Sequence, residues 1–78
     1  MEVSIKKLVH RIKHPYFRRY TNHTHYKLSI DGEEKCEVVI GHKFSTFKKF
    51  LKYAQEKYNF TDYKLTDMGV YNMTAQPL

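Results

Sequence analysis

Two alternating segments on either side of a turn signal most constrain what this chain can fold into. Apolar residues occupy every second position from 26 to 30 and again from 36 to 40, which is the period of a half-buried strand. Between them, Asp31-Gly32 is a hairpin signal, because glycine readily takes the positive φ that a tight turn needs. The sequence therefore predicts an antiparallel hairpin. Because Cys36 lies in phase with the apolar positions, we expect a buried small side chain rather than a nucleophile.

One amphipathic helix is predicted over 46–58. Its apolar residues recur at helical spacing, and lysines and a glutamate take the opposite side. Ser45 or Thr46 can cap its start, because a hydroxyl oxygen accepts a hydrogen bond from a free amide of the first turn. Asn59 is a typical helix end. An apolar stripe of this kind covers a sheet far more often than it binds a partner, so we expect it to form the core.

The segments on either side are less regular. Residues 3–13 match a helical stripe, and they also match two strand phases with a slip between them, as a bulge would give. We favour the bulged strand, which ends before Pro15 because the residue preceding a proline avoids the helical region. Residues 16–24 are basic, aromatic and polar without a period, which predicts a loop. Two short strands are predicted at 63–66 and 70–73, before a loose tail.

This order of elements is that of a β-rich α+β domain. The 78 residues predict a single domain, 1–78, whose small core leaves only a few kcal/mol of net stability. Cys36 is the only cysteine, which favours a reducing compartment or a chain stabilised by its partner. No apolar run approaches the length of a membrane span, and no secretory signal is predicted.

The net positive charge is concentrated in the first thirty residues. Seven Lys and Arg there face a single acid, whereas seven lysines in the remainder face seven acids. Four of the five histidines and several tyrosines also lie in the basic part. A segregated basic and aromatic segment is the pattern expected of a nucleic-acid binder. The RNA-binding residues that we predict are Lys6, Lys7, Arg11, Lys13, His14, Tyr16, Arg18, Arg19, His23, His25 and Lys27.

Within this segment, Arg18 and Arg19 stand between aromatic neighbours. A guanidinium binds phosphate through two parallel hydrogen bonds, and aromatic rings stack on unpaired bases. His23, His25 and Lys27 fall on one side of a strand, so a basic sheet face is expected. The same pattern also fits a solvated face that only keeps the chain soluble, and this alternative stays open.

Metal and catalytic chemistry find little support in the sequence. The pair His23-x-His25 places two imidazoles on one strand face, but zinc needs three or four ligands, and neither a cysteine pair nor a finger spacing is present. Asp31, Glu33 and Glu34 crowd a turn, where carboxylates are usually solvated. No triad order or glycine-rich phosphate loop occurs. We therefore expect no enzyme, cofactor, metal or small-molecule substrate.

Residues 5–41 resemble a known family. A Lys-His-Pro run at 13–15 precedes the basic aromatic stretch, and Asp31 and Cys36 follow at the spacing of the family. This order is similar to that of ribosomal small-subunit protein seventeen. The chain departs from the family where Ile30 replaces a histidine. The family's Arg-Pro-Leu-Ser-Lys run is also absent, and the predicted helix takes its place.

The resemblance implies an OB-like barrel that binds ribosomal RNA through a strand face and its loops. It makes small-subunit ribosomal RNA and neighbouring ribosomal proteins the expected partners. A mitochondrial ribosome is the expected location, or otherwise the cytoplasm. The residues that it places on the RNA-binding loop are Lys13, His14, Tyr16, Arg18 and Arg19. The expected fold is then a small OB-like antiparallel barrel or sheet with one amphipathic helix.

An alternative from another class is a small basic protein-interaction module, such as a virus-encoded inhibitor that docks on an acidic protein surface. Tyrosine and arginine are favoured in interface hot spots, which suits this composition. A DNA-binding regulator has less support, because no predicted helix carries base-reading side chains. Nuclease treatment separates the first two classes, because it removes partners that are held through RNA.

Overall fold

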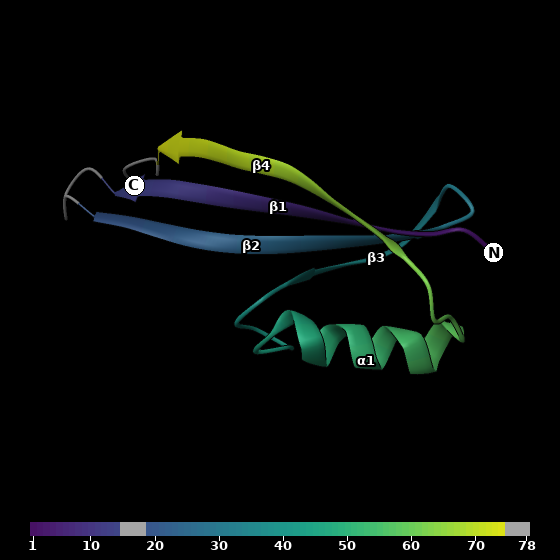
Figure 1. Cartoon of the computed structure of the whole chain (residues 1–78). Helices are drawn as coiled ribbons and strands as arrows, with labels where there is room; N and C mark the ends of the chain where they lie inside the picture. The colour runs from purple at the N-terminus through teal and green to yellow at the C-terminus, as the bar shows by residue number, and fades with distance from the viewer. Residues whose placement is uncertain (15–18, 75–78) are drawn as a thin grey trace.

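The computed structural model describes residues 1–14 and 19–74, which form a four-stranded sheet with a helix along one face (Figure 1). The elements are β1 (Val3–His14), β2 (Arg19–Ile30), β3 (Glu33–Val39), α1 (Phe47–Tyr58) and β4 (Lys64–Thr74). The strand order is β3-β2-β1-β4, and β4 alone runs parallel to its neighbour. This confirms the β-rich α+β class. Of the two forms expected, the structure has the open sheet rather than the barrel.

The hairpin of β2 and β3 lies where the alternation predicted it. Leu28 pairs with Cys36, and both side chains belong to the core or its rim. Asp31 and Gly32 have φ values of 52° and 84°, as a turn that matches the twist of the strands requires. The carboxylate of Asp31 also accepts a hydrogen bond from the amide of Glu2 at 2.8 Å. The turn thereby holds the start of β1.

Helix α1 confirms the predicted helix to within one residue. Thr46 is its N-cap, and the side-chain oxygen accepts a hydrogen bond from the amide of Lys49 at 3.3 Å. Asn59 ends the helix in the left-handed conformation, with a φ of 54°. Phe50 and Ala54 are the buried residues of α1, and they face the sheet.

The core lies between α1 and the near halves of β1 and β2. Tyr26 stacks on Phe47 with 4.5 Å between the ring centroids, so aromatic contacts join the helix to the sheet. Among the described residues, no side chain of β4 is buried. The buried residues are Val3, Ile5, Tyr26, Leu28, Phe50, Ala54 and Phe60.

The strands are much longer than the helix that covers them. Helix α1 and strand β1 each contain 12 residues. Twelve helical residues span about 18 Å, whereas twelve strand residues span about 40 Å. The far ends of β1, β2 and β4 therefore extend past the helix (Figure 1). We call this uncovered part, residues 8–14, 19–25 and 70–74, the distal ribbon.

The predicted bulge in β1 is wrong, although the strand itself is confirmed. β1 pairs with β2 without any register shift, starting with Val3 opposite Ile30. The apolar residues change phase for another reason. Ile5 is fully buried beneath α1, whereas Leu8 lines a groove on the opposite side of the sheet. The apolar residues therefore change phase because the early ones pack under α1 and the later ones lie on the opposite face of the sheet.

The predicted loop at 16–24 is also wrong for residues 19–24, which belong to β2. Residues 15–18 lie outside the described residues. The strand shows no apolar alternation there, because both faces of the distal ribbon remain accessible to solvent and no side chain in 19–25 is buried. Polar side chains are therefore suited to both solvent-exposed faces of this part of the strand.

The two short strands predicted near the C-terminus form one strand, β4, with a bulge. The register to β1 shifts between Lys7 opposite Asp67 and Val9 opposite Val70, so β4 holds one extra residue. Gly69 lies in this step with a φ of 89°, a conformation that glycine adopts most readily. The bulge explains why the sequence looked interrupted at this point.

Candidate nucleic-acid interface

The side of the sheet opposite α1 forms the candidate site, and we call it the open face. Successive residues of a strand point to opposite faces, so the register of the paired strands determines which residues lie there. From β1 and β2 it contains Ser4, Lys6, Leu8, His10, Ile12, His14, Arg19, Thr21, His23, His25, Lys27 and Ser29. From β3 and β4 it contains Glu34, Glu37, Val39, Lys64, Thr66, Met68, Tyr71 and Met73.

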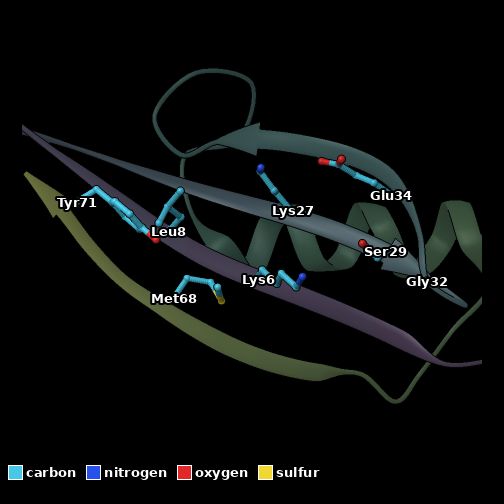
Figure 2. A pocket seen from close by; sticks show the side chains of 8 residues that line it. All are labelled: Lys6, Leu8, Lys27, Ser29, Gly32, Glu34, Met68 and Tyr71. Atoms are coloured by element: carbon cyan, nitrogen blue, oxygen red, sulfur yellow. The ribbon is translucent and has the colours of Figure 1, made fainter. Parts of the chain in front are cut away.

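A groove of about 460 Å³ lies on the open face, between the turn at Gly32 and the first residues of the distal ribbon. All four strands contribute to its wall: the lining residues are Lys6, Leu8, Lys27, Ser29, Gly32, Glu34, Met68 and Tyr71. Figure 2 shows these side chains in front of the sheet, with α1 behind it, so the groove opens away from the core. The lining combines two ammonium groups and the carboxylate of Glu34 with apolar side chains and one phenol ring. Such a groove suits a ligand that has anionic and flat apolar parts.

Two lysines, Lys6 and Lys27, are directly opposite each other on β1 and β2 in this groove. Like charges in that position destabilise a sheet. Within the part of the chain that the structure describes, neither ammonium has an ion-pair partner. Glu37 stands opposite Lys27 on β3, but its carboxylate lies 3.1 Å from His25 instead. An anion bound between the lysines would remove the repulsion.

Imidazole rings continue the open face beyond the groove. The rings of His10 and His25 lie 4.4 Å apart at an angle of 40°. Nδ1 of His25 is 3.1 Å from Oε1 of Glu37, which orients that ring. The ring of Tyr71 lies edge-on to His10, with 6.5 Å between centroids. Together these rings form a surface on which unpaired bases can stack.

The structure distributes the predicted RNA-binding residues over both faces of the sheet. Those on the open face are Lys6, His14, Arg19, His23, His25 and Lys27. Lys7, Arg11 and Lys13 point to the side of α1, where the guanidinium carbon of Arg11 is 4.1 Å from the centroid of the Tyr20 ring. Tyr16 and Arg18 lie outside the described residues. The cations therefore form two surfaces rather than one.

His10, Met68 and Tyr71 lie on the open face beside the imidazole rings or the lysine pair, and they were not among the predicted RNA-binding residues. His10 is directly opposite His23, and an uninterrupted strand at 3–14 would have placed it there. Met68 and Tyr71 come from β4. No local pattern predicts that β4 pairs in parallel with β1, so the sequence held no signal for their position.

Two observations concern metal ligands and the cysteine thiol. Among residues 1–14 and 19–74, no three His, Cys, Asp or Glu side chains are arranged to hold a metal ion. Cys36 packs against the core, and burial raises the pKa of its thiol. Because the thiolate is the nucleophilic form, a raised pKa lowers the reactivity of this cysteine.

No protein-family model, curated protein or solved structure matches this chain. The described residues contain no helix that is long and apolar enough to cross a membrane.

Proposed function

We propose that this protein binds single-stranded RNA on the open face. The observation that carries the proposal is the directly opposed pair of Lys6 and Lys27 in a groove with an apolar and aromatic wall. Ammonium groups neutralise phosphates and release counterions, while unpaired bases stack on flat rings. A sheet that packs one face on a helix and presents cations and rings on the other supplies both interactions.

The open face also has the length that an extended strand of RNA requires. His10 lies four residues beyond Lys6 on β1, and His23 lies four residues before Lys27 on β2. Four strand residues correspond to about 13 Å. An RNA strand that lies along β1 and β2 would therefore meet the lysine pair and the imidazole rings in succession, over the middle of the sheet.

A titration of labelled single-stranded RNA, followed by fluorescence anisotropy, tests the proposal. We expect Lys6→Gln with Lys27→Gln to weaken binding by about tenfold or more, and to lower the salt slope by about 0.7 for each lost phosphate contact. The matched control is Lys48→Gln with Lys49→Gln, which makes the same charge change on the exposed side of α1. Equal losses in both double variants would contradict a site on the open face.

The finer proposal is that the RNA belongs to the small ribosomal subunit. Its support is the resemblance over residues 5–41, a span that includes most of β1 and all of β2 and β3. The open sheet and the parallel β4 depart from the barrel that the resemblance implies. We expect the protein to sediment with small subunits, and to leave that fraction after RNase treatment. Protein that sediments free of small subunits both before and after RNase treatment would refute this finer proposal. Protein that still sediments with the subunit fraction after RNase treatment would also refute it.

A second candidate, a protein-interaction module, is favoured by the edge strand β4. Its side chains Leu65, Val70 and Tyr71 are 48%, 57% and 55% exposed, and its outer edge has no strand partner among the described residues. An apolar edge strand is a site where an extended segment of another protein can add to the sheet. Partner binding that survives nuclease digestion but is lost in Val70→Lys would favour this function over RNA binding.

A further inference from the structure

We propose that the open face takes up protons from solution when it binds RNA, so that the complex tightens as the pH falls. The inference rests on the proposed function and adds its regulation. The proton acceptors are a group that we call the histidine cluster, which consists of His10, His14, His23 and His25. Imidazole is the side chain that ordinarily changes its charge between about pH 5 and 8.

The register of β1 and β2 brings three members of the cluster together, while His14 lies four residues from His10 along β1. His10 is directly opposite His23, and its ring lies 4.4 Å from that of His25. Two imidazolium ions at this separation repel each other. A phosphate placed over the rings would offset that repulsion, because a nearby negative charge favours the charged form of imidazole.

The groups that face the cluster are mainly cationic. Strands β1 and β2 supply Lys6, Arg19 and Lys27, strand β3 supplies Glu34 and Glu37, and strand β4 supplies the phenol of Tyr71. Glu37 contacts His25 at 3.1 Å and can stabilise that one imidazolium. In the described residues no other carboxylate contacts an imidazole of the cluster. One carboxylate cannot neutralise four imidazolium rings, so a bound polyanion can supply the negative charge that the others lack.

Thermodynamic linkage between proton binding and RNA binding determines whether the affinity rises or falls with pH. If RNA favours the protonated cluster, protonation favours RNA to the same extent. Each proton taken up on binding raises the affinity about tenfold for every unit by which the pH falls. Each imidazolium that neutralises a phosphate also steepens the salt slope by about 0.7 on a single strand. Acidification should therefore increase both the affinity and its salt dependence.

The fifth histidine provides a matched control. His42 is exposed in the turn that follows β3, and it is not part of the open face. The variant His42→Gln removes one imidazole and leaves the cluster intact. The variant His10→Gln with His25→Gln removes the two rings in contact and keeps polar side chains of similar size. A comparison of the two separates a local effect from the general loss of titratable charge.

Calorimetric titration of the full chain with a single-stranded RNA tests the inference, in two buffers of different ionisation enthalpy at about pH 6.5. We expect the wild type and His42→Gln to take up about one proton or more per complex, and the double variant to take up less than half as much. Binding without proton uptake by the wild type would overturn the inference and leave the RNA-binding proposal intact. An undiminished uptake by the folded double variant would also overturn it.

The wild-type measurement needs no substitution, so a folding defect in the double variant does not remove the test. Absence of binding to single-stranded RNA at every pH would overturn the proposed function itself. The two failures are therefore distinguishable in one set of titrations.

Discussion

The half of the sheet beneath α1 and the distal ribbon are made from the same strands. They differ in the contacts that stabilise them and in the side chains that they expose to solvent. Beneath the helix, Ile5 and Leu28 are fully buried. In the distal ribbon no described side chain is buried. The covered half therefore supplies the free energy of folding, whereas the ribbon presents side chains to the solvent on both faces. Coverage by α1, rather than strand formation, divides this chain into a core and a surface.

The ribbon relies on backbone pairing and local side-chain contacts. The Arg11 guanidinium lies over the Tyr20 ring at 4.1 Å, and Nε2 of His14 is 2.9 Å from the Thr21 hydroxyl oxygen. Each such contact is worth roughly 0.2–1 kcal/mol. Substitutions in the ribbon should therefore affect binding more than folding, and substitutions under α1 should do the opposite.

The largest effect is expected from Phe50→Ala. Phe50 is fully buried at the centre of the core, and truncation of a buried phenylalanine costs about 3–5 kcal/mol in the free energy of unfolding. Chemical denaturation followed by circular dichroism measures this loss, and a core this small will lose most of its folded population. A loss below about 1 kcal/mol would show that the core is elsewhere.

The next effect separates the two faces of the ribbon. We expect Tyr71→Ala to weaken RNA binding by about 1–3 kcal/mol, the contribution of one stacked base. The free energy of unfolding should change by only about 0.5 kcal/mol, because the side chain is exposed.

Tyr20→Ala is the control for Tyr71→Ala. Tyr20 is 50% exposed and Tyr71 is 55% exposed, but Tyr20 lies on the side of α1. Anisotropy titrations of both variants make the comparison. An equal loss of affinity would mean that RNA does not discriminate between the two faces.

A smaller loss of stability is expected at the N-cap of α1, in the covered half of the molecule. Thr46→Ala removes the oxygen that accepts from the amide of Lys49, and loss of such a cap costs about 1 kcal/mol in the free energy of unfolding. Ser45→Ala, one residue earlier, should change stability by no more than about 0.5 kcal/mol. Urea denaturation of the two variants checks the difference. A larger loss of stability in Ser45→Ala than in Thr46→Ala would contradict the assignment of Thr46 as the N-cap.

The smallest effect concerns Cys36. Because burial raises the pKa of its thiol, the folded protein should react with a thiol-alkylating reagent more slowly at neutral pH than the chain unfolded in urea. The folded state also holds this proton more tightly than the unfolded state. Stability from this group is therefore present at neutral pH and falls as the pH rises through the titration range of the thiol. Equal alkylation rates in both states would contradict the burial.

The elements that the sequence could predict are those with a local signal. Asp31-Gly32 and the alternation around it predicted the hairpin, and Thr46 and Asn59 bounded the helix. These signals work because a turn, a cap or an amphipathic stripe involves residues that are close in the chain.

The remaining features depend on contacts between distant segments. Residues 19–24 looked like a loop, because a strand with two solvated faces has no apolar period. The position of Tyr71 depends on the parallel pairing of β4 with β1, which no short window reveals. The basic residues could be identified as a group, but they were not divided between two faces, because a bulge was expected within residues 3–13 and a loop over 16–24.

The most direct test of the central claim, that RNA lies on the open face, is an NMR titration of the isotope-labelled protein with single-stranded RNA. The account predicts that resonances of Lys6, His10 and Tyr71 shift or broaden first, while those on the exposed side of α1, such as Lys48 and Lys52, remain unchanged. Shifts centred on the helix lysines, with the open face unaffected, would contradict it.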